Sequence, residues 1–242
     1  MNIAQKTVLI TGANRGIGRA LVDEALRRGA KRVYAGTRSA FENADKRVTP
    51  LTLDVTSVSQ IQRAADEVDT LDVLINNAGI ALYDDLSNFD VIEQHLAVNL
   101  FGWFNVTRAF LPQLRRSKGA IVNNLSLAAL APLPIIPAYS ISKAAAFNMT
   151  QSLRALLADQ GVTVHAVFLG PIDTDMTQGF EIPKASPASA ALGIFDGLEK
   201  GEEDIFPDPA SESMAEGWRT GVVKALERQY AALVPESAAN PE

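Results

Sequence analysis

Short apolar runs alternate with longer amphipathic stretches along most of this 242-residue chain. The first apolar run, at residues 7–11, is rich in β-branched side chains and leads into a helical pattern that stops at Gly29. Further strand-like runs stand at residues 32–36, 48–53, 71–75, 120–126, 162–168 and 205–206. This alternation predicts an α/β fold, in which a doubly wound parallel sheet of about seven strands carries helices on both faces.

The run at residues 48–53 is interrupted by a proline. Pro50 has no backbone N–H, so it fits an edge strand better than a central one. In the common doubly wound order 3-2-1-4-5-6 the third strand lies at or near an edge of the sheet. Pro50 therefore agrees with the predicted topology.

Two long helical patterns lie in the middle of the chain. One runs from about Asn88 to Arg116, and the other begins near Pro137, a favoured first-turn residue, and stops at Gly161. Asn99 interrupts the apolar stripe of the first helix, and a buried amide needs hydrogen-bond partners. We expect the apolar members of that stripe to face the core or a subunit interface: Phe89, Ile92, Leu96, Leu100 and Phe104.

Composition narrows the class of protein. The length suits a single domain over residues 1–242, and the absence of cysteine is compatible with a reducing cytoplasm. Lys and Arg total 22 against 28 Asp and Glu, and the basic residues are scattered, which argues against nucleic-acid binding. We see no signal peptide or membrane span, so the expected location is the cytoplasm. His95 has no visible partner as a metal ligand and His165 is expected to pack in the core, so no metal site is predicted.

A strand, a glycine turn and a helix follow one another at the start of the chain. Thr11 ends the strand, and Gly12, Gly16 and Gly18 form the spacing G-x-x-x-G-x-G. Glycines let the backbone approach a pyrophosphate, which can then sit at the helix N-terminus. Glycines also make plain tight turns, but the strand and helix on either side favour a dinucleotide site.

The end of the second strand bears on which dinucleotide binds. NAD-binding proteins usually place an acidic residue there, about 20 residues beyond the glycine turn. This chain has Thr37 and Arg38 instead, and Arg15 lies inside the glycine turn. Two guanidinium groups can converge on a 2′-phosphate, so we expect NADP(H) rather than NAD(H). The alternative is that both arginines are solvated surface charges.

Polar residues also follow three later strands. Asp54 either hydrogen-bonds an adenine or caps the helix that begins near Ser57. The segment from Asn76 to Gly79, Asn-Asn-Ala-Gly, offers small residues and amides to a cofactor, although a plain turn is the alternative. Ser126 stands at the carboxyl end of its strand, the edge where open α/β sheets bind ligands.

A tyrosine and a lysine share one face of the second long helix. Tyr139 and Lys143 are four residues apart. At about 4 Å and an effective dielectric constant near 20, an ammonium attracts a phenolate by roughly 4 kcal/mol, which would lower the phenol pKa by about three. The pair predicts a phenol able to exchange a proton near neutral pH. An ordinary amphipathic helix is the alternative.

Taken together, these residues resemble the short-chain dehydrogenase/reductase family in its single-domain form. The likeness covers Thr11 to Thr174 by motif and reaches about Phe206 by layout, and it implies a Rossmann-like fold. Its motifs stand in the family's order: Thr11-Gly12-x-x-x-Gly16-x-Gly18, Asp54, Asn76-Asn77-Ala78-Gly79, Asn99, Ser126 and Tyr139-x-x-x-Lys143.

The resemblance implies a role for each residue of a catalytic tetrad. Tyr139 is the general acid for carbonyl reduction, and Ser126 hydrogen-bonds the carbonyl oxygen, where preplaced donors stabilise developing negative charge. Lys143 holds the nicotinamide ribose and lowers the pKa of the tyrosine, while Asn99 supports a water chain. The implied cofactor-binding residues are Gly12, Asn14, Arg15, Gly16, Ile17, Gly18, Thr37, Arg38, Asp54, Val55, Asn77, Ala78, Gly79, Tyr139, Lys143, Gly170, Ile172 and Thr174.

Two positions depart from the family pattern. Leu169 stands where the family commonly has a proline before glycine, and Leu125 stands where a second serine often precedes the catalytic one. Gly170 is retained, so the first departure concerns the local turn more than the cofactor contact. The second leaves Ser126 as the single candidate serine.

We expect an NADPH-dependent carbonyl reductase, or an alcohol dehydrogenase in reverse, acting on a small or medium hydrophobic ketone. Alternatives are reduction of 3-oxoacyl groups on a carrier protein, which the acidic balance mildly disfavours, a non-catalytic NADP-sensing protein, and a structural oligomer. The family usually forms homodimers or homotetramers through the two long helices. Residues 175–200 are expected to form a substrate lid, and 235–242 a frayed tail. Apolar residues near Ser126 suggest the substrate class, and simple packing is the alternative for them: Leu127, Leu130, Leu133, Ile135 and Ile136.

Overall fold

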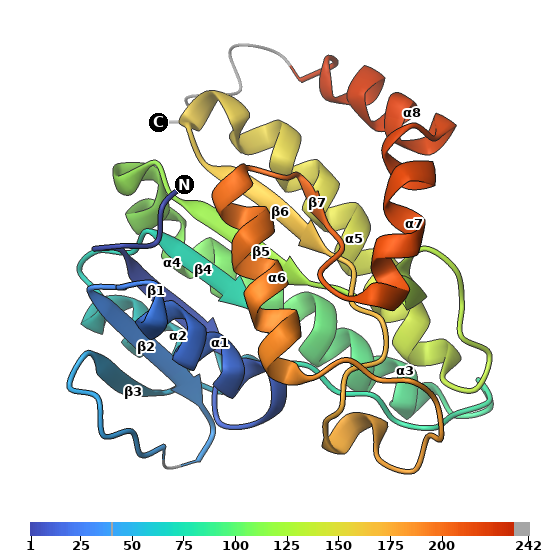
Figure 1. Ribbon diagram of the computed structural model, residues 1–242, viewed down its shortest axis with the longest axis horizontal. Coiled ribbons are helices and arrows are strands. Elements are labelled where there is room, and N and C mark those ends of the chain that lie inside the picture. The colour runs from blue at the N-terminus through green and yellow to red at the C-terminus, as the bar shows by residue number, and fades with distance from the viewer. Residues whose placement is uncertain (40, 235–242) are drawn as a thin grey trace.

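The computed structural model, which describes residues 1–39 and 41–234, is built on one parallel sheet (Figure 1). Its seven strands follow the order β3-β2-β1-β4-β5-β6-β7. This confirms the predicted doubly wound α/β fold, and it places Pro50 on the edge strand, opposite Ala35. The strands are β1 (Thr7–Thr11), β2 (Arg32–Thr37), β3 (Val48–Thr52), β4 (Val73–Asn76), β5 (Ala120–Asn124), β6 (Thr163–Val167) and β7 (Asp204–Ile205).

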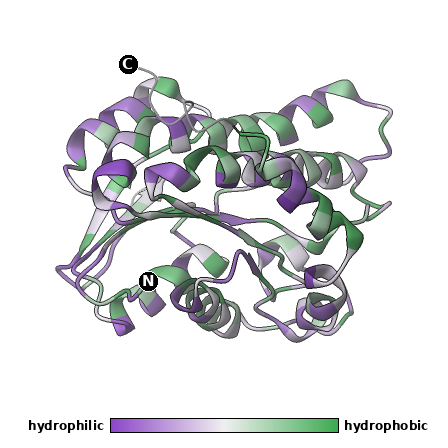
Figure 2. Cartoon of the chain, turned by 90° about the horizontal axis from the view of Figure 1, so that it is seen from above, coloured by the Kyte–Doolittle hydropathy of each residue, from purple (hydrophilic) through white to green (hydrophobic). Residues whose placement is uncertain are grey.

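Helices cover both faces of the sheet, as the layers in Figure 2 show. Side chains alternate between the faces along each strand, so Val8 and Ile10 pack on one side and Leu9 on the other. Helices α1 (Gly16–Arg27) and α6 (Pro187–Lys200) cross in front of the sheet in Figure 1. Helices α2 (Val58–Glu67), α4 (Trp103–Ser117) and α5 (Pro137–Leu157) contribute to the opposite side of the core.

The predicted helical stretch from Asn88 to Arg116 is confirmed, but it is not α-helical throughout. Asn88 caps α3 (Phe89–Leu96), a π-helical turn follows at Ala97–Gly102, and α4 comes next. Of the predicted apolar stripe, Phe89 is 67% exposed and Phe104 is 44% exposed, so these two residues do not face the core of the chain, and the alternative of a subunit interface remains for them. The buried stripe instead contains His95, Asn99 and Trp103, spaced four residues apart. Because two of these three residues are polar, a pattern of apolar residues alone does not identify this face as the buried one.

The predicted lid, residues 175–200, consists of two structurally different parts. Residues 175–186 are irregular apart from a 3₁₀ turn at Asp175–Thr177, whereas 187–200 form α6. Ala190, Ile194 and Leu198 of α6 are buried against the sheet, so this part does not suit a lid. Ser186 caps α6 by accepting from the N–H of Ser189, and Pro187 occupies the first turn of the helix.

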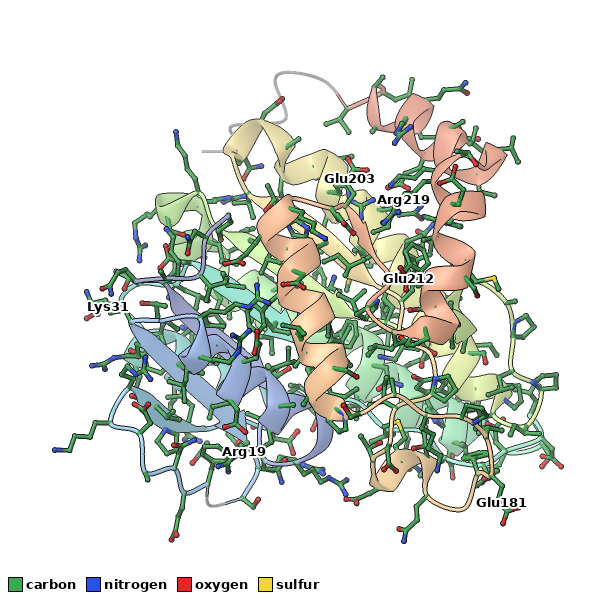
Figure 3. All side chains as sticks on the ribbon, in the orientation of Figure 1. Arg19, Lys31, Glu181, Glu203, Glu212 and Arg219 are labelled. Atoms are coloured by element: carbon green, nitrogen blue, oxygen red, sulfur yellow. The ribbon has the colours of Figure 1, made fainter. Side chains whose placement is uncertain are left out.

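The last two helices are α7 (Pro209–Arg219) and α8 (Val222–Ala231), and a cluster of buried charges attaches α8 to β7. Lys224 is 2% exposed and lies 2.7 Å from Asp204, which also pairs with Arg154 of α5 at 2.8 Å. Glu203, labelled in Figure 3, lies 2.9 Å from the same lysine. The predicted tail, residues 235–242, lies outside the described residues.

Candidate functional site

A cleft of about 2010 Å³ opens at the carboxyl ends of the strands. It is lined by the glycine turn after β1, the end of β2, the segments after β3, β4, β5 and β6, and the start of α5. Every residue predicted to bind the cofactor lines it, as do Ser126, Tyr139 and Lys143. Asn99 of the predicted tetrad does not line the cleft.

The glycine turn depends on residues without a side chain. Gly12 and Gly16 have φ of +66° and +52°, which favour glycine. A Cβ on Gly18 would lie 2.0 Å from the carbonyl oxygen of Gly12, and one on Gly12 would lie 2.9 Å from Cα of Ala78. Arg15, the residue before α1, makes no side-chain cap, so the first N–H groups of α1 remain available toward the cleft. This is the geometry that receives a pyrophosphate.

The two arginines predicted to meet a 2′-phosphate line the same cleft, but they differ in their contacts. Arg15 pairs with Asp175 of the 3₁₀ turn, with 2.5 Å between Nη1 and Oδ2, and both side chains are mainly exposed. Arg38 is exposed at the cleft, and its positive charge helps to lower the pKa of the nearby Asp54 carboxyl group. The side chain of Thr37 fits the prediction poorly, because it is buried and its hydroxyl donates to the carbonyl of Ser39.

Asp54 does not cap a helix. Ser57 caps α2 by accepting from the N–H of Gln60, whereas Asp54 accepts from the N–H and hydroxyl of Thr56 at 2.9 and 2.7 Å. Burial opposes ionisation of Asp54, but the two Thr56 bonds and the charge of Arg38 outweigh it and hold the carboxyl pKa below its usual value. Of the two sequence interpretations, helix capping is wrong, and a carboxylate facing the cleft remains.

The Asn-Asn-Ala-Gly segment locks the end of β4 to the glycine turn. The Thr11 hydroxyl accepts from the N–H groups of Asn77 and Ala78 at 2.9 and 3.0 Å. The amide of Asn77 donates to the carbonyl of Thr11 at 3.0 Å, and Asn76 is buried and donates to Asn123 at 2.8 Å. These bonds make the segment a rigid wall of the cleft.

Tyr139 and Ser126, both expected to contact the substrate oxygen, lie close together, although the residues belong to α5 and to the segment after β5. Burial raises the pKa of the Tyr139 phenol to about 12, and the nearby Ser126 hydroxyl opposes this only in part. The predicted lowering of this pKa by Lys143 is therefore wrong for the protein by itself.

The position of Lys143 explains that correction. Its Nζ lies 5.7 Å from the ring centroid of Tyr139, donates to the carbonyl of Asn124 at 2.7 Å and lies 4.2 Å from the ring centroid of Trp103. The residue is 4% exposed, and burial lowers the pKa of its amine to about 7. An amine that is only partly protonated at neutral pH attracts a phenolate less than the sequence argument assumed.

Asn99 and His95 shape the cleft from behind. Asn99 is fully buried, and its side chain bonds both the N–H and the carbonyl of Ile80 at 3.0 Å and the Ser142 hydroxyl at 2.9 Å. The Nε2 of His95 accepts from the N–H of Leu82 at 3.0 Å, so the proton of the neutral ring lies on Nδ1, which contacts the Val91 carbonyl. The sequence did not predict the role of His95, because its partner lies in a loop without periodicity.

The outer part of the cleft is apolar. Leu127, Leu133 and Ile136 line it, but Leu130 packs on the core and Ile135 does not reach the cleft, so two of the five predicted residues are wrong. Tyr83 from the loop after β4 stacks on Phe180 of the 175–186 segment, with 6.1 Å between ring centroids. Further apolar residues line the same part: Leu82, Met176 and Ile182.

The sheet order, the glycine turn and the cleft define a dinucleotide-binding α/β protein. The family model described as short chain dehydrogenase matches residues 6–184. The chain is 34% identical over 191 residues to estradiol 17-beta-dehydrogenase 2 of Rattus norvegicus, covering 72% of this chain and 50% of the relative. It is 32% identical over 228 residues to 11-beta-hydroxysteroid dehydrogenase-like 3 of Arabidopsis thaliana, covering 84% of this chain and 74% of the relative. The chain belongs to the short-chain dehydrogenase family.

A solved structure extends the likeness to nearly the whole chain. It is a short chain dehydrogenase from Burkholderia cenocepacia in complex with NADP, 36% identical, with a TM-score of 0.87. The match covers 97% of this chain and all of that one. By contrast, this chain spans about half the length of the rat relative. Within the described ranges, every helix is too short or too polar to cross a bilayer.

Proposed function

We propose that this protein is an NADPH-dependent oxidoreductase that reduces the carbonyl of small or medium hydrophobic ketones and oxidises the corresponding alcohols. One observation carries the proposal: the Ser126 hydroxyl and the Tyr139 phenol lie close together in the lining of the cleft, and Lys143 belongs to the same lining. The preference for NADP(H) is supported by Arg15 and Arg38 at the cleft and by the NADP named for the Burkholderia structure.

The cleft residues fit a nicotinamide dinucleotide. The glycine turn and the α1 N-terminus would hold the pyrophosphate, Asp54 and Val55 would lie near the adenine, and Gly170 to Thr174 near the carboxamide. The bound cofactor supplies or accepts a hydride. Gly170 has a second role, because its N–H donates to Asp208 and a Cβ there would lie 2.5 Å from that carboxylate.

The chain's own residues supply the proton and the electrostatic stabilisation. The Ser126 hydroxyl and the Tyr139 phenol donate to the substrate oxygen as negative charge builds there, and Tyr139 transfers its proton. A phenol held protonated by burial is suited to donate in the reduction direction. Lys143, in its cationic form, orients the nicotinamide ribose and favours the phenolate left after proton transfer. Asn99 holds the strand end beside these groups through Ile80.

The test measures oxidation of NADPH and of NADH with aryl, alkyl and β-keto-ester ketones, in wild type and in Tyr139→Phe. We expect a preference for NADPH and a loss of about 10²–10⁴ in kcat for the variant, the range for a positioned general acid. NADPH fluorescence titration is the control, and it should show that Tyr139→Phe still binds NADPH, because the variant removes only one hydroxyl from the set of cofactor-binding groups. NADPH binding without turnover of any ketone would refute the reductase assignment and favour a cofactor-sensing protein.

We also infer a homodimer or homotetramer in the cytoplasm. Exposed apolar side chains on the two long helical regions support the assembly, since Phe101, Phe104, Ile141 and Leu156 are all at least 43% exposed. Light scattering coupled to size exclusion should give at least twice the 25.9 kDa mass of one chain. A single species of the monomer mass would exclude the assembly.

A further inference from the structure

Trp103 lies directly behind Lys143 and outside the cleft. It is the first residue of α4, is fully buried, and presents its ring to the lysine ammonium, with 4.2 Å from Nζ to the ring centroid. Its indole N–H donates to the carbonyl of Ala78 at 2.7 Å. One side chain thus contacts both the lysine and the Asn-Asn-Ala-Gly wall.

The surroundings of the lysine make this contact significant. An ammonium has three N–H donors and needs compensation when buried. The Asn124 carbonyl accepts one of them at 2.7 Å, and within the described residues no carboxylate forms an ion pair with Lys143. Burial opposes the charge and lowers the pKa of the Lys143 amine. Two aromatic faces also favour the cation, and the indole of Trp103 at 4.2 Å is nearer than the ring of Tyr139 at 5.7 Å. Trp is also the most effective aromatic residue for this contact.

We propose that Trp103 is a positioning residue that supports the cationic form of Lys143 through its ring face and fixes the Ala78 carbonyl through its N–H. The remaining ammonium N–H groups are then left for the cleft. The catalytic consequence rests on the proposed function, but the contact itself can be tested without cofactor or substrate.

The first experiment follows the Lys143 amine in the free protein by NMR of ¹³C-labelled lysine, with the signal assigned through Lys143→Arg. Trp103→Leu should lower the titration midpoint by about half to one and a half pH units, the range for a lost cation–π contact. Trp103→Phe keeps an aromatic face and should fall between this variant and wild type. Phe110→Leu is the matched control, because it removes a fully buried ring from the same helix, and within the described residues no cation contacts that ring. Its midpoint should equal that of wild type.

A second measurement keeps the tryptophan in place, in case Trp103→Leu does not fold. The chain has two tryptophans, so Trp218→Phe assigns the two indole N–H signals. The Trp103 signal should shift with pH at the midpoint of the lysine, and Lys143→Met should abolish that shift. Three outcomes would each overturn the proposal. The folded Trp103→Leu protein could show the wild-type lysine midpoint, or Phe110→Leu could shift the midpoint as much as Trp103→Leu does. The third is a Trp103 indole signal that does not change as the lysine titrates. Loss of ketone reduction alone would bear on the proposed function and not on this contact.

Discussion

The Arg15–Asp175 ion pair spans the mouth of the cleft and makes a quantitative prediction for cofactor affinity. Arg15 comes from the glycine turn and Asp175 from the segment after β6, 160 residues further along the chain. If Arg15 is to bind a 2′-phosphate, it must weaken or leave its contact with Asp175. Replacing Asp175 with asparagine keeps the size of the side chain and removes the competing charge. We expect Asp175→Asn to bind NADPH more tightly.

The magnitude follows from exposure. The two side chains are 68% and 67% exposed, so the pair is screened and contributes about 0.2–1 kcal/mol despite its short distance. Releasing that energy lowers the dissociation constant for NADPH by a factor of about 1.4–5. NADH has no 2′-phosphate, so its affinity should not change. Raising the ionic strength should shrink the gain, because exposed charges are screened within about 10 Å at 0.1 M salt.

The assay is a fluorescence titration with NADPH and NADH at low and high salt, on wild type, Asp175→Asn, Arg15→Met and the double variant. Arg15→Met should weaken NADPH binding, and Asp175→Asn should add nothing in its presence if the arginine mediates the effect. Equal tightening for NADPH and NADH would refute the reasoning, since the carboxylate would then repel the pyrophosphate common to both. An Asp175→Asn effect that survives loss of Arg15 would also refute it.

Two other substitutions test the packing and charge of the site. Gly18→Ala should destabilise the fold by more than about 3 kcal/mol in urea denaturation, because its Cβ would lie 2.0 Å from a backbone oxygen. Gly217→Ala is the control and should be neutral or stabilising, because a Cβ there would have nothing within 4 Å. Similar losses of stability in both variants would contradict the close approach at Gly18. Lys143→Met should raise the free energy of unfolding most below about pH 7, by up to about 5 kcal/mol. The sign follows because burial lowers the amine pKa in the folded state, so the unfolded chain binds the extra proton between about pH 7 and 10.5, and wild type recovers stability as pH rises through that range. A difference between the two proteins that does not vary with pH would contradict the buried amine.

Local sequence signals predicted the parts of the site that depend on neighbours along the chain. The glycine turn, Pro50 on an edge strand and the shared face of Tyr139 and Lys143 are all properties of short segments. The place of Ser126 in the cleft was also predictable, because the carboxyl ends of parallel strands share one edge of the sheet.

The predictions that failed concern properties that depend on the three-dimensional arrangement of distant residues. The direction of the Tyr139 pKa depends on burial and on where the lysine points, and neither follows from a spacing of four residues. The Arg15 partner is distant in sequence and lies in an irregular segment. In the sequence, Trp103 is one more apolar residue of a helix, and its contact with the Lys143 ammonium is apparent only in the structure.

The π-helical turn at Ala97–Gly102 sets the angular relation between two halves of one long helical rod. Each residue of an α-helix advances the chain by about 100° around the axis. A π turn accommodates one additional residue, so deleting a single residue from this turn would restore regular α-helical bonding and rotate everything after it by about that angle relative to Asn99. Trp103 would then no longer face Lys143, and Phe110 would turn out of the core. The extra residue therefore fixes the rotation of α4 relative to α3. With this rotation the Asn99 amide, which bonds Ile80, and the Trp103 indole, which contacts Lys143, face the same wall of the cleft.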